Sequence, residues 1–212
     1  MNNLLIIIIF VFITIIYSQY IFINKKNNSY EILQSNNPDK ETFEDLINNK
    51  ITVVFTSIFD DLDINKIMDD KSKKDELKQN LFKHFKYYHI PLTFTYKFRI
   101  DQEDEQSYKP IVKETSYRHL IVLLKGLKKI IIFNPEQEPN LYVKNNQSLI
   151  NFWEGDKTEY PNFLKLKYIE VILKNNQMIY IPYGWWYSEY NITDTQCISS
   201  SSESVFSYIL KK

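Results

Sequence analysis

A run of twenty uncharged residues near the N-terminus, 4–23, constrains this chain more than any other feature. Its core, LLIIIIFVFITII, is almost entirely isoleucine, leucine, phenylalanine and valine. Twenty helical residues rise about 30 Å, which matches the hydrocarbon thickness of a bilayer. A helix in lipid satisfies its own backbone hydrogen bonds, so these β-branched residues are expected to be helical there. The run predicts a single-pass transmembrane anchor over residues 1–23 that contacts the membrane through residues 4–23.

A cleaved signal peptide and a buried soluble helix are the alternatives for this segment. A signal peptide normally begins with a basic patch and ends at small residues. Here Met-Asn-Asn precedes the run, and no Ala-X-Ala-like site follows it. The topology stays open, because Lys25 and Lys26 favour a cytoplasmic C-terminal side. The sequons that begin at Asn27, Asn146 and Asn191 favour the opposite side.

The charge balance excludes some classes of function. The chain has 26 Lys and Arg against 26 Asp and Glu, whereas a protein that coats nucleic acid needs a basic excess or a basic face. We therefore expect no nucleic-acid partner. The single cysteine, Cys197, permits neither an internal disulfide nor a cysteine-based zinc site. The lack of alanine and the abundance of Ile, Asn and Lys indicate an AT-rich genome, as in some large DNA viruses or amoebae. The membrane of a virus particle or a host cell fits that bias.

The remaining sequence divides into a polar tether over residues 24–40 and one domain over residues 41–212. Periodic apolar residues predict helices over 42–47 and 73–87. Alternating patterns between turn signals predict strands over 51–55, 93–100, 119–124, 129–133, 168–173, 178–181 and 205–210. The serine-rich residues 199–204 suggest a linker before the last of these strands. Many short strands with flanking helices predict a mainly β fold, a sandwich or barrel-like roll.

Two stretches carry a resemblance to a known family. Residues 118–136 read RHLIVLLKGLKKIIIFNPE, and residues 168–187 read YIEVILKNNQMIYIPYGWWY. The first resembles the hairpin of two hydrophobic strands around Gly and Lys, followed by Phe-X-Pro, of the JmjC/cupin-like (double-stranded β-helix) family. The second resembles that family's Ile-Pro-X-Gly-Trp-Trp-His segment. The resemblance implies a double-stranded β-helix, a form of jelly roll, over about residues 40–210.

Enzymes of this family hold iron with a His-X-Asp/Glu pair and a distal histidine, and use 2-oxoglutarate to hydroxylate or demethylate. Two histidines and one carboxylate leave open positions for cosubstrate and oxygen. At the matching positions this chain has Lys113, Thr115 and Tyr187. The resemblance therefore implies a divergent member with degenerate metal-site positions, no catalytic residues, no bound metal and no cofactor. Lys128 matches the lysine that contacts the 2-oxoglutarate carboxylate in one branch of the family.

One set of residues keeps an enzymatic alternative open. Glu114, His119 and Glu189 could form a variant centre for Fe(II), which would make the chain a divergent Fe(II)/2-oxoglutarate-dependent hydroxylase. A structural or surface histidine is the competing interpretation of His119.

The favoured interpretation is a membrane-anchored pseudoenzyme that acts as a binding or structural module for an unknown protein or small-molecule ligand. Its pocket is expected at the mouth of the roll, near Lys128, Trp153, Trp185 and Trp186. A carbohydrate- or peptide-binding jelly roll is a third class that is compatible with the same fold, because a fold does not fix a function.

Overall fold

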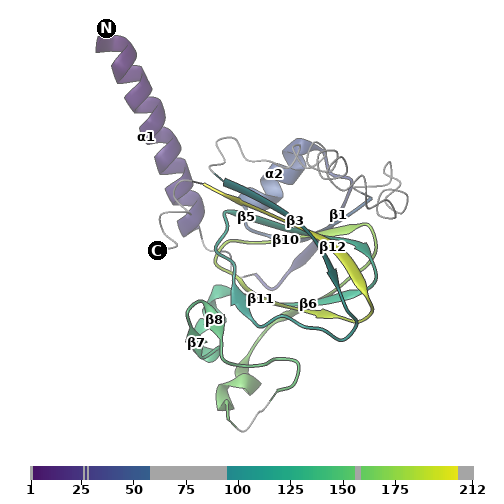
Figure 1. The fold of residues 1–212 in the computed structure, drawn as a ribbon. Helices are drawn as coiled ribbons and strands as arrows, with labels where there is room; N and C mark the ends of the chain where they lie inside the picture. The colour runs from purple at the N-terminus through teal and green to yellow at the C-terminus, as the bar shows by residue number, and fades with distance from the viewer. Residues whose placement is uncertain (1, 26, 28, 58–94, 156–158, 205–212) are drawn as a thin grey trace.

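The computed structural model describes residues 2–25, 27, 29–57, 95–155 and 159–204. The long helix α1 (Asn2–Asn24) projects from a domain in which two sheets lie face to face (Figure 1). The predicted helix over 73–87 and the predicted strand over 205–210 lie outside the described residues.

The domain is built on two six-stranded sheets. The first has the order β1-β2-β10-β5-β12-β3. Its strands are β1 (Ile32–Asn36), β2 (Thr52–Thr56), β3 (Thr95–Glu103), β5 (Arg118–Lys125), β10 (Gln177–Ile181) and β12 (Thr195–Glu203). The second has the order β7-β8-β4-β11-β6-β9. Its strands are β4 (Val112–Lys113), β6 (Lys128–Phe133), β7 (Val143–Lys144), β8 (Gln147–Ser148), β9 (Ile169–Leu173) and β11 (Trp186–Asn191). This two-sheet roll confirms the predicted mainly β, cupin/JmjC-like fold.

The apolar core lies between the two sheets, where alternate residues of each strand point inward. Both sheets contribute to it: from the first, Val54, Ile121, Leu123, Ile179, Ile181 and Cys197; from the second, Ile130, Ile132, Ile169, Val171 and Leu173. In β9 the burial alternates strictly between buried and exposed. One face of this strand therefore packs inward while the other meets solvent.

Helix α2 (Lys40–Asn48) covers the outer face of the first sheet. Phe43 and Ile47 on this helix are fully buried against outward residues of β2, β5 and β10. The helix begins at Asp39, whose carboxylate accepts a hydrogen bond from the backbone N–H of Thr42 at 2.8 Å. An Asp at this position stabilises a helix by satisfying a free backbone N–H. The capping residue is therefore Asp39.

The outer face of the second sheet is covered by the segment between β6 and β9. This segment contains the 3-10 helices η3 (Pro135–Asn140) and η4 (Pro161–Lys165) as well as the β7–β8 hairpin. Outward residues of the sheet and of this segment form a separate apolar cluster: Ile111, Ile131, Phe133, Leu141 and Trp186, with Phe152, Trp153 and Leu166 packed against it.

Two predictions about chain organisation were wrong. The predicted tether over 24–40 is part of the domain in its second half, because Ile32–Asn36 pairs in parallel with Thr52–Thr56 at the edge of the first sheet. The predicted linker over 199–204 falls largely in β12, which pairs with both β3 and β5 in the middle of the sheet. Serine has a small side chain that a strand can bury, and Ser200 and Ser202 are 5% and 3% exposed.

Candidate functional site

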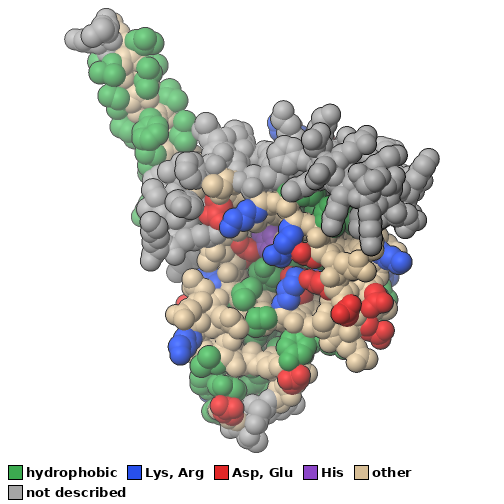
Figure 2. Space-filling model, in the orientation of Figure 1, with side chains coloured by type: hydrophobic (Ala, Val, Ile, Leu, Met, Phe, Trp, Pro, Cys, Tyr) green, Lys and Arg blue, Asp and Glu red, His purple; other side chains and the backbone are tan. Residues whose placement is uncertain are grey.

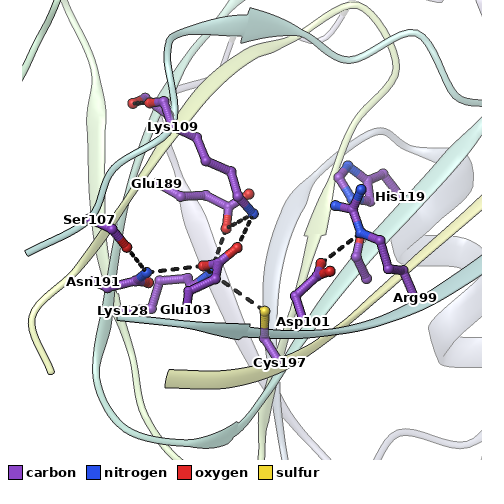
Figure 3. Close-up of polar contacts among 12 residues, drawn as sticks. Arg99, Asp101, Glu103, Ser107, Lys109, His119, Lys128, Glu189, Asn191 and Cys197 are labelled. Atoms are coloured by element: carbon purple, nitrogen blue, oxygen red, sulfur yellow. Dashed lines mark hydrogen bonds and ion pairs between the residues drawn. The ribbon is translucent and has the colours of Figure 1, made fainter. Parts of the chain in front are cut away.

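Strand β3 brings charge into the roll. Its side chains alternate, and Phe98 and Ile100 pack against the apolar cluster beneath α2. The other face carries Arg99, Asp101 and Glu103 (Figure 3); Glu103 reaches Lys128 in the interior, whereas the Arg99 side chain stays 66% exposed. The apolar face of this strand therefore packs outward under the helix, and the charged face lines one end of the roll.

A cavity of about 690 Å³ opens at this end of the roll. It is lined by Lys97, Phe98, Arg99, Lys113, Glu114, Thr115, Ser116, His119, Tyr187, Ser199 and Ser201. Figure 2 shows the only described histidine within this hollow, surrounded by lysine, arginine and acidic side chains. The volume falls in the range of small-molecule sites, and most of the residues that line it carry polar or charged groups.

An acid–imidazole pair lies on the floor of the cavity. His119, on β5, contacts the Glu114 carboxylate through Nδ1, and its Nε2 lies 3.1 Å from Ser199 Oγ. The backbone N–H of Ser116 also donates to Glu114, at 2.5 Å. Burial would raise the pKa of Glu114, but His119 and these hydrogen bonds outweigh it and lower that pKa. Both residues are at most 6% exposed, so the pair is a satisfied, buried unit.

The three degenerate metal-site positions do come together on the cavity wall. Lys113, on β4, directs its ammonium to Glu138 at 2.7 Å and lies 5.4 Å from the centre of the Trp186 ring. Tyr187, on β11, packs its ring edge-on against His119 with centroids 5.5 Å apart. Burial raises the pKa of Tyr187 well above its usual value, so it stays a neutral phenol.

These side chains do not fit a ferrous ion. A protonated lysine has no lone pair to give, a threonine hydroxyl is a weak ligand, and a neutral phenol is not the anionic donor that iron requires. Among the residues that the structure describes, His119 is the one imidazole that lines the cavity, and it already contacts Glu114. Glu189 of the predicted variant centre is engaged elsewhere, with Lys128 and Lys109. No step of an iron-dependent reaction can therefore be derived from this donor set.

Lys128 lies deeper in the roll, in a cluster of four charged side chains (Figure 3). Its ammonium is 2.7 Å from Glu103 and 2.6 Å from Glu189. Lys109 binds the same two carboxylates, at 2.7 and 3.1 Å. Asn191 donates to Glu103 at 3.0 Å. We call Lys128, Glu103, Glu189 and Lys109 the interior quartet; its formal charge is zero.

The quartet is held in its charged form. Burial alone would lower the pKa of Lys128, but the charge of Glu189 and the bond to Glu103 raise it above its usual value. Burial would likewise raise the pKa of Glu103, but hydrogen bonds from Lys109 and Lys128 lower it to about 2. The Lys128 side chain is 0% exposed, so its ammonium faces only its own chain.

Within the part of the chain that the structure describes, the only three candidate metal ligands whose atoms lie within 4.8 Å of one another are Asp101, Glu103 and Cys197. Lys128 Nζ lies 2.7 Å from Glu103 and 3.6 Å from the Cys197 sulfur. Arg99 neutralises Asp101 at 2.7 Å. Burial raises the pKa of Cys197 to about 11, so its thiol stays protonated. Cations of the chain therefore already occupy the places from which a metal would be bound.

The three tryptophans do not line the cavity, which corrects the pocket predicted from the sequence. Trp185 belongs to the core between the sheets at 1% exposed, and Trp186 belongs to the cluster outside the second sheet at 0%. Trp153 donates its indole N–H to Ser188 at 2.7 Å on that same outer side. Large aromatic rings stabilise a sheet by burying area, and these three serve that purpose.

Sequence reasoning missed the two carboxylates that neutralise Lys128. Glu103 lies beyond the predicted strand over 93–100 and was given no role, and Glu189 was considered only as part of a variant iron centre. A period-two run of charges, Lys97, Arg99 and Asp101 followed by Glu103, was the available signal. Charged side chains on one strand can be buried only when side chains of opposite charge pair with them. The sequence does not show which residues lie opposite this strand.

The comparisons agree with this fold. Residues 97–194 match the family model described as a cupin-like domain. The chain is 28% identical over 71 residues to tRNA wybutosine-synthesizing protein 5 of Homo sapiens, which covers 33% of this chain and 22% of that protein. It is 29% identical over 76 residues to arginine-specific demethylase JMJ20 of Arabidopsis thaliana, which covers 35% of this chain and 16% of that protein.

A further match is lysine-specific demethylase JMJ30 of Arabidopsis thaliana, 25% identical over 88 residues. The chain spans about a fifth of the length of these relatives or less. The fold and cavity define a double-stranded β-helix of the cupin class. Residues 97–194 carry the cupin-like domain, and together with the JmjC-type relatives at low identity this is consistent with a divergent member of the JmjC/cupin-like family.

Proposed function

We propose that this chain is a membrane-anchored, non-catalytic cupin-like module that binds a ligand in the cavity of its roll. One observation supports the proposal: the residues that match the iron-ligand positions of the family, Lys113, Thr115 and Tyr187, line one cavity, and none of them supplies an imidazole or a carboxylate. The loss of strong ligands removes most of the affinity of a site for a transition metal.

The interior quartet supports the same proposal from the cosubstrate side. In relatives of one branch, the lysine at the place of Lys128 contacts the carboxylate of 2-oxoglutarate. Here Glu103 and Glu189 already occupy that ammonium, at 2.7 and 2.6 Å. A dianionic cosubstrate would have to displace a buried carboxylate of the chain, and an unpaired buried charge costs several kcal/mol, about 3–5. Carboxylates of the chain itself therefore neutralise the Lys128 ammonium, in the place that a carboxylate of the cosubstrate would take.

The anchor part of the proposal rests on α1. Asn3–Asn24 has a mean hydropathy of 2.5 and is long enough to cross a membrane, a test that a signal sequence also passes. The C-terminal end of the helix is docked on the domain: the Phe22 and Tyr117 rings stack at 4.3 Å, and Lys50 Nζ donates to the Ile23 carbonyl at 3.0 Å. Such contacts favour a retained anchor, because a cleaved segment would leave Tyr117 and Lys50 without them.

An iron- and 2-oxoglutarate-dependent enzyme is the alternative. It is motivated by the names of the relatives, which are demethylases and a protein that synthesises a modified tRNA nucleoside. The donor set of the cavity argues against it, since His119 is the only imidazole there in the described part of the chain.

Cobalt titration tests the proposal. The full-length chain in detergent would be titrated with Co²⁺ under argon and followed by visible absorption, and succinate release from 2-oxoglutarate would be measured with Fe²⁺ and ascorbate. We expect neither saturable absorption bands nor succinate. The Glu114→Gln variant provides the control, because it removes the carboxylate that lies against His119. One equivalent of bound cobalt that is lost in this variant, together with succinate release by the parent chain, would establish the enzymatic alternative.

A further inference from the structure

Among the described residues, the charged side chains that line the cavity are the cations Lys97, Arg99 and Lys113 and the carboxylate of Glu114. Arg99 pairs with Asp101 and Lys113 with Glu138, so Lys97 is the cation of this lining whose charge no described carboxylate balances. The Glu114 carboxylate is buried and is engaged by His119 and by the Ser116 N–H. Clefts lined by one sign of charge attract ligands of the opposite sign. The open part of the cavity is therefore suited to an anion.

The cations lie in register with hydroxyl groups. On neighbouring strands of the first sheet, Lys97 is directly opposite Ser201, and Arg99 is directly opposite Ser199. Residues opposite each other on one face of a sheet have Cβ atoms about 5 Å apart. All four side chains line the cavity. Two ammonium or guanidinium donors and two hydroxyl donors thus form one continuous wall.

Several donors on this wall have spare capacity. The Lys97 ammonium and the Ser201 hydroxyl have no hydrogen-bond or ion-pair partner among the described residues. Arg99 binds Asp101 only through Nε, which leaves both terminal nitrogens for another acceptor. An oxyanion accepts several such bonds at once, and bonds to charged donors are about twice as strong as neutral ones. Lys128, in contrast, is saturated by its own carboxylates.

The cavity also lies close to the docked end of α1. Ser116 lines the cavity, and the next residue, Tyr117, stacks on Phe22 in the last turns of that helix. If α1 spans a bilayer, the headgroup region lies beside this rim of the cavity. An oxyanion could therefore arrive from solution or as the phosphate of a lipid.

We propose that the cavity binds a compact oxyanion of the phosphate or carboxylate kind, held by Lys97, Arg99 and the hydroxyls of Ser199 and Ser201. The inference rests on the proposed function, because it assigns to the same cavity a ligand that needs no metal. The oxyanion is the headgroup phosphate of an anionic lipid or the acidic group of a soluble molecule.

Two binding measurements on the chelator-treated full-length chain test this assignment. In detergent, inorganic phosphate and succinate would be titrated by calorimetry. In a second arm, phosphatidic acid retained by the chain would be counted by native mass spectrometry, with phosphatidylcholine as the neutral comparison. We expect one anion bound per chain in at least one arm. Binding in the first arm assigns a soluble source, and selective retention in the second assigns a lipid.

Variants connect the binding to the wall. Lys97→Ala is expected to weaken binding about tenfold or more, and Ser201→Ala about threefold to tenfold. Lys129→Gln is the matched control: it also removes one positive charge, but from the outer side of β6, where it pairs with Glu170. It is expected to bind as the parent chain does.

Two results would overturn the inference: no anion bound in either arm, or binding that Lys97→Ala leaves unchanged. Both leave the cobalt and succinate experiment untouched. A chain that binds cobalt and releases succinate would refute the proposed function instead, whatever it does with phosphate.

Discussion

Replacing Lys128 by methionine tests whether the interior quartet is a closed ionic unit. Methionine keeps most of the aliphatic volume and removes the charge, so the quartet goes from neutral to a net negative charge at a place where Lys128 is 0% and Glu189 5% exposed. Removal of one partner from a buried ion pair costs about 3–5 kcal/mol. Lys109 remains 2.7 Å from Glu103 and 3.1 Å from Glu189, so we expect the lower end, about 3 kcal/mol.

For a domain of this size, 1 kcal/mol shifts the Tm by about 2–4 °C, so Lys128→Met is expected to melt about 6–12 °C below the parent chain. Thermal unfolding followed by the fluorescence of the three domain tryptophans measures the shift. Lys129→Met, on the same strand, is the control. It breaks a half-exposed pair with Glu170, which is worth about 0–1 kcal/mol.

The double variant Lys128→Met/Glu189→Gln makes the test specific to charge. It leaves Lys109 with Glu103 as one neutral pair, so it should recover a large part of the lost stability despite carrying more substitutions. If Lys128→Met melts at the same temperature as Lys129→Met, or if the double variant melts at a lower temperature than Lys128→Met, the interior quartet does not stabilise the fold through its charges.

Two further predictions concern acid and the β5–β6 turn. The pKa of Glu103 is lowered from 4.5 to about 2, so its contribution to the stability of the fold is fully present above pH 4.5 and is lost as the pH falls toward 2. The Tm difference between the parent chain and Lys128→Met should therefore narrow when melting is repeated from pH 7 down to pH 3. A Tm difference that stays constant over this range would contradict this assignment. Gly126→Ala should destabilise the domain by at least about 1 kcal/mol, because Gly126 has φ of +98° and an added Cβ would lie 2.4 Å from the Asp194 carbonyl oxygen. Chemical denaturation measures this loss of stability. Gly184→Ala is the control: Gly184 has φ of +84° but open space around it, so this variant carries the backbone strain without the clash.

The sequence predicts those strands in which the alternation is simple. Residues 168–173 and 178–181 lie close to β9 and β10, because the positions of β9 alternate between buried and exposed and residues 178–181 of β10 form a short apolar run that is buried throughout. It failed for β12, where four successive serines carry no apolar pattern although the strand lies between β3 and β5. A central position in a sheet is a tertiary property, and local composition does not record it.

The candidate site was only half predictable. The family pattern led to Lys113, Thr115 and Tyr187, which the structure does place together on one cavity. The partners of Lys128 could not be inferred, because Glu103 and Glu189 lie 25 and 61 residues away in sequence and meet it only after the strands pair. The prediction that the tryptophans line the pocket was wrong. The resemblance to the family gives their positions in the chain, but it does not show which side of the sheet each ring faces.

The most direct test of the account is the iron content of the full-length chain at equilibrium. The chain in detergent would be dialysed under argon against Fe²⁺ with 2-oxoglutarate, and the iron concentration would be measured on both sides of the dialysis membrane. The account predicts equal iron in both compartments, because Lys113, Thr115 and Tyr187 offer no strong ligand. One equivalent of iron retained per chain, and lost in Glu114→Gln or Tyr187→Phe, would contradict it.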